Sequence, residues 1–411
     1  GGASGGLTNI KVTIINTTTA GVDQSIVTAK NILIQSSTSI QKDSTATASA
    51  GAVGGSANSV SDEITVTNTT ATVIGSKGST ASLTAREDVM FVAETDNHFD
   101  GYATAVAGAI LAKGKATAKQ TVKNTVKVTI YPATIRADSH DVTISVLANQ
   151  IKAMGGAGGV AAGSSVEAAS DMTVTAFVEF LNGTGSNHAA VSAPGRDILV
   201  NTRTDTTAKV FGQIKFTVDG LSFLSTDVEN RMNIASTVNL GAYTELSAGN
   251  DLSIAALIGS IYALASAYSE TGSNINTQSR PTAEVNVTAK AWIRGAENAK
   301  LSAANLLSLV AATAENNNIY TKAYSYGFTA GGTGSVVSKA VNNTKLYGQI
   351  DILGDQSELH GKDIYVSASA PRESEVQYRK EAKYRAETVT EFVKQTVERI
   401  TTTIEKVAEK V

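Results

Sequence analysis

A short phrase recurs seven times along this chain of 411 residues and constrains its fold more than any other feature. Each phrase begins with Asp, Asn or, once, Leu, followed by an apolar residue, a spacer and a second apolar residue. The phrases begin at Asn31, Asp88, Asp141, Asp197, Asp251, Leu306 and Asp363. Their starts lie 57, 53, 56, 54, 55 and 57 residues apart. Such an even period indicates a repeat protein, because units that each leave an apolar face uncovered must stack.

Each unit contains three strand-forming segments. The anchor phrase comes first, and an Ala/Gly-rich stretch with period-two alternation follows, as at Ala46, Ala48, Ala50 and Ala52. The third segment alternates β-branched with polar residues and closes on an Asn-Thr pair that we interpret as a turn, as at Asn16 and Asn68. The spacing predicts an all-β parallel β-helix, or β-solenoid, over residues 1–370, with two or three coils per unit. Residues 1–22 are interpreted as the second half of a preceding copy, so we expect an excerpt from a longer protein.

Composition supports closely packed walls and offers little chemistry. Hydrophobic residues make up 42% of the chain, but only 5% is aromatic and there is no Cys. The net charge is -3, so the sequence indicates no nucleic-acid partner. Residues 252–269 carry no charge, but their Gly, Ser and Tyr content argues against a membrane span.

The sequence predicts no catalytic, metal-binding or cofactor-binding residues. Short matches to nucleophile-elbow and dinucleotide-binding patterns lack the helix that each site requires. The four histidines are spaced too widely to indicate a zinc site, and the recurring Asp is interpreted as a turn cap rather than a calcium ligand. A possible binding surface is one strand face with three aromatic residues, Tyr324, Tyr326 and Phe328. The alternative is that these rings pack beneath a loop or a terminal helix.

The pattern changes after Pro371, where 17 of the last 40 residues are charged. Apolar residues then recur at alternating steps of four and three, at Val393, Val397, Ile400, Ile404, Val407 and Val411. This seam predicts an amphipathic helix or coiled-coil segment within residues 371–411. Such a helix would either cap the last coil or mediate oligomerisation.

The unit resembles the repeats of large secreted bacterial filamentous adhesins, of the filamentous-haemagglutinin and leukotoxin families. The segments 246–254 (LSAGNDLSI) and 360–368 (HGKDIYVSA) carry this resemblance best. It implies a right-handed β-helix, export to the cell surface, and attachment to a protein or glycan of a host or neighbouring cell.

We therefore expect a non-enzymatic, extracellular adhesive or structural fibre segment. Two alternatives are a self-assembling filament or sheath subunit and a carbohydrate-active β-helix enzyme. The enzyme would need a cluster of acids with aromatic subsites, and the sequence shows no such concentration.

Overall fold

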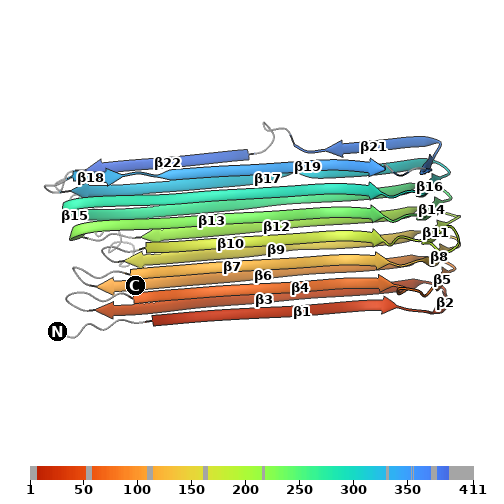
Figure 1. Ribbon diagram of the computed structural model, residues 1–411, viewed down its shortest axis with the longest axis horizontal. Helices are drawn as coiled ribbons and strands as arrows, with labels where there is room; N and C mark the ends of the chain where they lie inside the picture. The colour runs from red at the N-terminus through yellow and green to blue at the C-terminus, as the bar shows by residue number, and fades with distance from the viewer. Residues whose placement is uncertain are drawn as a thin grey trace, which may run out of the picture.

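The computed structural model describes residues 7–51, 58–108, 114–160, 165–214, 218–329, 333–352, 354, 356–371 and 377–387. These residues form a β-solenoid in which long strands run back and forth and stack in register (Figure 1). Every named strand pairing is parallel, as in a coil that returns to the same direction once per turn. The all-β, parallel repeat architecture predicted from the period is confirmed.

One 55-residue unit forms one coil, so the prediction of two or three coils per unit is wrong. The register pairs Asn31's neighbour Ile32 with Val89, and Val89 with Val142, which is one full period each time. Seven short strands, one from each coil, form a sheet of their own. The coils are wide because the long strands hold 16 to 24 residues and span about 50 to 80 Å.

Three parallel sheets make the walls. The first long sheet contains β1 (Leu7–Val22), β4 (Asn58–Ile74), β7 (Gly114–Ile130), β10 (Ser165–Phe180), β13 (Val218–Leu240), the second half of β15 (Leu252–Gly295), β18 (Thr333–Val336) and β19 (Lys339–Ile352). The second contains β3 (Ile32–Gly51), β6 (Val89–Gly108), β9 (Val142–Val160), β12 (Ile198–Ile214), the first half of β15, β17 (Leu306–Thr329), β21 (Asp363–Ser369) and β22 (Gln377–Glu387). The short sheet contains β2 (Ile26–Ala29), β5 (Ala81–Ala85), β8 (Ala133–Ala137), β11 (Ala190–Ala193), β14 (Glu245–Ala248), β16 (Lys300–Ala303) and β20 (Glu358–His360).

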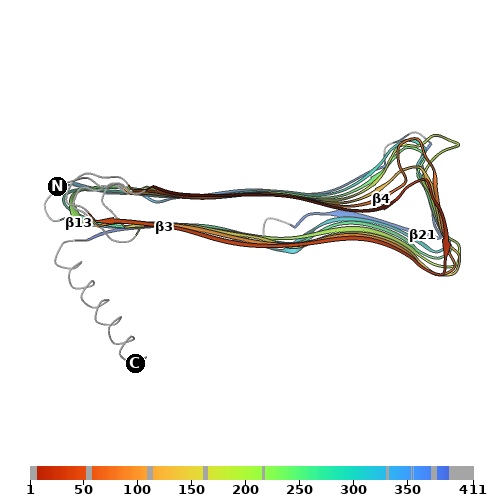
Figure 2. The same ribbon diagram turned by 90° about the horizontal axis from the view of Figure 1, so that it is seen from below.

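The cross-section is a thin slab that widens at one end. The two long sheets run close together along most of their length and diverge towards the short sheet, which closes a triangular end (Figure 2). Large side chains such as Phe91, Ile144 and Leu83 fill the wide end. Inward positions of the thin part include small, fully buried residues such as Ala153 and Ala208, although Phe99 of the adjacent coil occupies the same column. Small inward side chains allow the two long sheets to lie close together in this part of the slab.

Polar side chains also cross the thin part of the interior. The Nδ2 of Asn230 donates to the backbone oxygens of Ala208 and Leu264, at 2.8 and 3.1 Å, from the opposite wall. Ser236 Oγ donates to Thr202 Oγ1 at 2.8 Å across the same gap. These bonds hold the two long sheets together where few apolar contacts are available.

Asn16 and Asn68 lie inside strands, so their interpretation as turn residues is wrong. They face inward in one column of the first long sheet with Asn124. Asn16 Nδ2 donates to Asn68 Oδ1 at 2.8 Å, and Asn68 Nδ2 donates to Asn124 Oδ1 at 2.7 Å. The amides form a ladder because one amide can both donate and accept along the stack.

The predicted helical segment, 371–411, is not supported where the structure describes it. Gln377–Glu387 form strand β22, which pairs in parallel with β17. The positions of the proposed seam, Val393, Val397, Ile400, Ile404 and Val407, lie outside the described residues. In the described part of the chain no helix is long and apolar enough to cross a bilayer.

Candidate interaction surface

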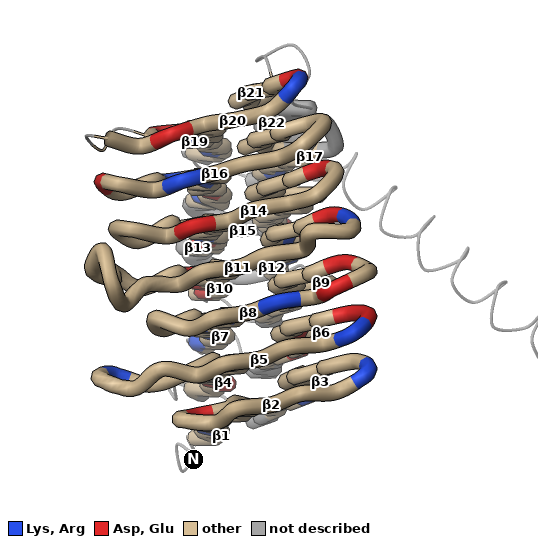
Figure 3. The backbone as a smooth tube through the Cα atoms, turned by 90° about the vertical axis from the view of Figure 1, so that its right-hand side faces the viewer, with Lys and Arg blue, Asp and Glu red and all other residues tan. Residues whose placement is uncertain are grey.

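The recurring Asp or Asn of each unit forms a ladder at the corner where the short sheet leads into the second long sheet. Each backbone N–H donates to the side-chain oxygen of the previous coil's residue: Asp88 to Asn31 at 3.0 Å, Asp141 to Asp88 at 3.3 Å, Asp197 to Asp141 at 3.1 Å, Asp251 to Asp197 at 2.9 Å and Leu306 to Asp251 at 3.0 Å. The carboxylates therefore cap backbone groups, as expected, but those of the next coil rather than of their own turn. Seen from the triangular end, acidic and basic residues are interspersed along this corner (Figure 3).

The four histidines do not converge. Each lies beside a different acid: His98 at 3.1 Å from Asp100, His140 at 3.6 Å from Asp88, His188 at 3.5 Å from Glu245 and His360 at 3.0 Å from Glu358. Among the described residues, no group of three or more potential ligands could hold a metal ion.

The proposed binding face of Tyr324, Tyr326 and Phe328 has mixed exposure. Tyr324 stacks on Tyr268 of the preceding coil, with ring centroids 5.2 Å apart and planes 4° from parallel. Tyr326 is only 4% exposed. Phe328 belongs to β17, but its side chain lies outside the described part. Because the rings of Tyr268 and Tyr324 stack face to face, their contact stabilises the packing of two adjacent coils as well as contributing to the outer surface.

A groove at the other corner, where the first long sheet leads into the short sheet, was not indicated by the sequence. We call it the corner groove, and its volume is about 320 Å³. It is lined by Glu179, Phe180, Leu181, Asn182, Asn239, Leu240, Gly241, Arg294, Gly295 and Ala296. No motif marks these residues, because they belong to three coils and meet only through the strand register.

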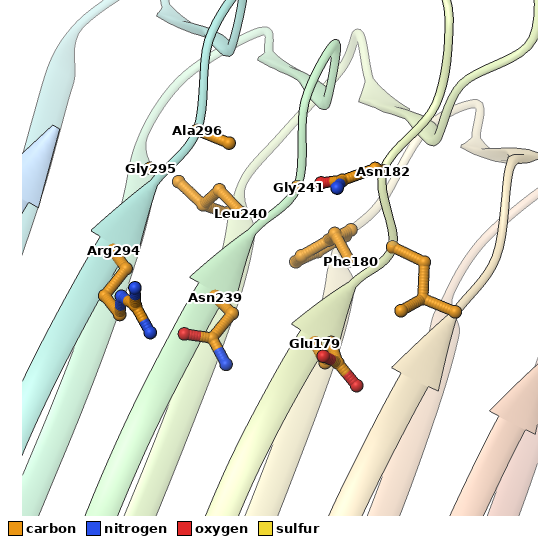
Figure 4. A pocket seen from close by; sticks show the side chains of 10 residues that line it. Glu179, Phe180, Asn182, Asn239, Leu240, Gly241, Arg294, Gly295 and Ala296 are labelled. Atoms are coloured by element: carbon orange, nitrogen blue, oxygen red, sulfur yellow. The ribbon is translucent and has the colours of Figure 1, made fainter. Parts of the chain in front are cut away.

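Glu179, Asn239 and Arg294 form one outward column of the corner groove. The register pairs Glu179 with Asn239 and Asn239 with Arg294, and the three side chains project from adjacent strands β10, β13 and β15 (Figure 4). Buried Phe180 and Leu240 follow in the next column and form the floor. A negative, a neutral amide and a positive group are therefore held in a row on rigid strands.

Arg294 is held in place by aromatic stacking. Its guanidinium carbon lies 4.2 Å from the ring centroid of Trp292, and Lys290 Nζ lies 3.1 Å from the same centroid. Trp292 Nε1 donates to Asp351 Oδ2 at 2.8 Å, which fixes the indole. Burial lowers the pKa of Lys290 from its ordinary value. Both contacts are cation–π interactions, which orient the cations without consuming their hydrogen-bond donors.

The rim of the groove continues into the longest corner connection of the described coils. Nine residues, 181–189, link β10 to β11, whereas the other coils use between two and six residues here. Thr184 and Asn187 exchange backbone bonds, with Thr184 N to Asn187 O at 2.8 Å and Asn187 N to Thr184 O at 3.2 Å. The loop extends beyond its neighbours beside β11 (Figure 3). Loops carried by a rigid scaffold are common binding elements.

Comparisons of this chain with family models, with curated proteins and with solved structures find no match. The fold itself is that of a parallel β-solenoid.

Proposed function

We propose that this chain is a segment of an extracellular adhesive or structural fibre of an exported bacterial protein, and that it is not an enzyme. The observation that carries the proposal is the continuous stack of parallel coils, because outward positions that stay in register become columns of side chains on a stiff wall. Such a wall presents several contact points in fixed geometry, which favours multivalent attachment to a surface. The resemblance to filamentous adhesins supports the same role, including right-handed winding, which parallel crossovers strongly prefer.

A surface protein or glycan of a host or neighbouring cell is the partner that this proposal expects. The test is attachment of beads coated with the full chain to cultured cells and to immobilised matrix proteins and glycans. Beads coated with the heat-unfolded chain are the control for non-specific adsorption. We expect the folded chain to raise bead retention about tenfold, since multivalent contact amplifies weak single contacts. Equal retention of both bead types would contradict the proposal, and release of sugars from a polysaccharide panel would favour the enzyme.

Self-assembly is the second candidate, supported by the distribution of exposed apolar side chains. Among the described residues, those with large exposed areas gather on the first coil, as Leu7 (79%) and Ile26 (87%), and on the last, as Ile364 (50%) and Tyr365 (54%). A surface of this kind can pair with another strand edge. Filaments in electron micrographs of the purified chain would favour this candidate, and a monodisperse particle in light scattering would oppose it.

A further inference from the structure

We propose that a second copy of this chain stacks head to tail on the solenoid. The edge formed by β1, β2 and β3, here the lower edge, would lie on the edge formed by β19, β20, β21 and β22, here the upper edge (Figure 1). The inference rests on the self-assembly candidate and deepens it by naming the orientation, the register and the contacts of the junction.

Both edges expose side chains of a kind that the inner coils bury. Val27 and Ile34 on the lower edge, and Leu359 on the upper edge, pack against the core but are only partly buried. Inner residues of the same columns, such as Leu83 and Phe91, are fully buried. Apolar strips along an open sheet edge favour association, and a second copy offers a cover with the same cross-section.

A continued register places apolar residues on apolar residues at the junction. The strand pairs, followed coil by coil, give three such contacts, namely Val27 with Leu359, Ile34 with Val366 and Leu33 with Tyr365. Leu33 and Tyr365 lie on the outer face of the wall, where they are 59% and 54% exposed. Stacking would remove part of this apolar surface from water, which stabilises the junction.

The ladder of recurring Asp and Asn residues has a free donor at one edge and a free acceptor at the other. Within the solenoid, Asp88 N donates to Asn31 Oδ1 at 3.0 Å, and Ile32 N donates to Asp88 O at 2.9 Å. The N–H of Asn31 has no acceptor among the described residues, and the carboxylate of Asp363 has no donor among them. Head-to-tail stacking repeats the ladder across the junction, with Asn31 N donating to Asp363.

Head-to-tail order also continues the direction of the strands. The strands of each wall pair in parallel, and β1 of the second copy would run parallel to β19. Two lower edges facing each other would pair their strands antiparallel. The lower edge holds strands of 16, 4 and 20 residues, whereas a stable interface takes about 20 to 30 residues from each partner. The junction is therefore large enough to hold two copies together.

Cysteine cross-linking tests the register directly, because the chain has no Cys of its own. Lys30 and Lys362 immediately precede Asn31 and Asp363, and stacking would bring their Cα atoms to about 4.8 Å, within reach of a disulfide. Lys30→Cys mixed with Lys362→Cys should form a linked dimer under mild oxidation, and a chain with both changes should form longer multimers. Lys30→Cys mixed with Arg196→Cys is the matched control, since Arg196 holds the same position in an inner coil.

Substitutions at the junction should weaken association without unfolding the chain. We expect Leu33→Lys, which places a charge in the apolar contact, and Asp363→Ala, which removes the ladder acceptor, each to raise the dissociation constant about tenfold. Leu33→Lys mixed with Tyr365→Glu should recover association, because opposite charges then meet. Asp171→Ala, on a wall away from both edges, is the control and should change nothing. Sedimentation velocity measures association, and circular dichroism checks the fold of each variant.

Linkage of Lys30→Cys to itself but not to Lys362→Cys, or association that is unchanged in Leu33→Lys, would overturn the inference while leaving self-assembly intact. A chain that stays monomeric at every concentration would overturn both. If removal of residues 388–411 then made that monomer associate, the occupant of the upper edge would be the chain's own segment instead. Retention of coated beads on cells tests the adhesive role separately.

Discussion

At the scale of single residues, the repeating Asp acts by joining one coil to the next. Asp197 Oδ1 accepts from the backbone N–H of Asp251 at 2.9 Å and from Asn250 Nδ2 at 2.7 Å. The one departure, Leu306, has no oxygen to offer, and the next coil compensates because Asp363 N donates to the backbone oxygen of Asn305 at 3.0 Å. The period that marks the sequence is thus the period of an inter-coil hydrogen bond.

Asp197→Ala should lower the free energy of unfolding by about 1 to 2 kcal/mol, because two partly buried donors lose their acceptor. Asp363→Ala is the matched control, since no hydrogen bond between its carboxylate and another described residue is present, and it should change stability by less than about 0.5 kcal/mol. Chemical denaturation followed by circular dichroism measures both. Equal effects of the two substitutions would show that the ladder adds no stability.

Asp62 should make stability depend on pH. This side chain is 1% exposed inside the solenoid, where Ser44 Oγ donates to it at 2.9 Å and Tyr102 N donates to it at 3.1 Å. Burial raises the pKa of its carboxyl group above the ordinary 3.8. The folded state therefore holds its proton more tightly than the unfolded state does. The contribution is fully present below pH 3.8 and is lost as the pH rises through the folded pKa.

The difference between the wild type and Asp62→Asn isolates this contribution from other carboxylates. Relative to the variant, the wild type should lose stability as the pH is raised from about 3 to neutrality. Thermal unfolding at a series of pH values measures the difference. A difference that stays constant with pH, or that grows in favour of the wild type, would contradict the assignment.

At the scale of strands, the repeat period and the alternation of residues predict the parallel stacking and the small-residue walls, because a wall position can be inferred from a single strand. They do not predict one coil per unit. Strands of 16 to 24 residues exceed the usual length, and the far bend lacks a consistent turn signal. β15 runs through that bend as one strand of 44 residues.

Neither the inner Asn ladder nor the corner groove could be predicted from the sequence, because both depend on the register between strands. Asn68 looks like a turn residue from its neighbours alone, and only the register shows that it faces Asn16 and Asn124. The groove depends on Glu179 and Arg294, which are more than a hundred positions apart in the chain. The charges of segment 377–387 favour a helix, whereas the edge of β17 offers it a strand partner. Tertiary pairing overrides local propensity there.

At the scale of the whole molecule, each coil contacts mainly its two neighbours, so coils should be removable as units. Residues 197–250 make one complete period, and their removal joins Arg196 to Asp251. The deletion makes β9 and β15 neighbours, and the two strands carry an irregularity at the same position. Between the positions that pair with Thr204 and Thr206 of β12, β9 runs from Ala148 to Ile151 and β15 from Ile258 to Ile261, so both carry the same extra residue. The deletion therefore brings two bulged strands into register.

The shortened chain should fold cooperatively into a stack lower by about 4.8 Å, the rise of one coil. Small-angle scattering measures this loss, and circular dichroism measures the retained strand content. Deletion of residues 197–223 is the matched control, because it removes β12 but leaves half of a coil that cannot close, and this variant should unfold or aggregate. If both deletions fold equally well, or neither does, then coils are not the independent units of this architecture. Success of the full-period deletion alone would show that stability is a sum over neighbouring coils, which is the property a stiff surface fibre needs in order to vary its length.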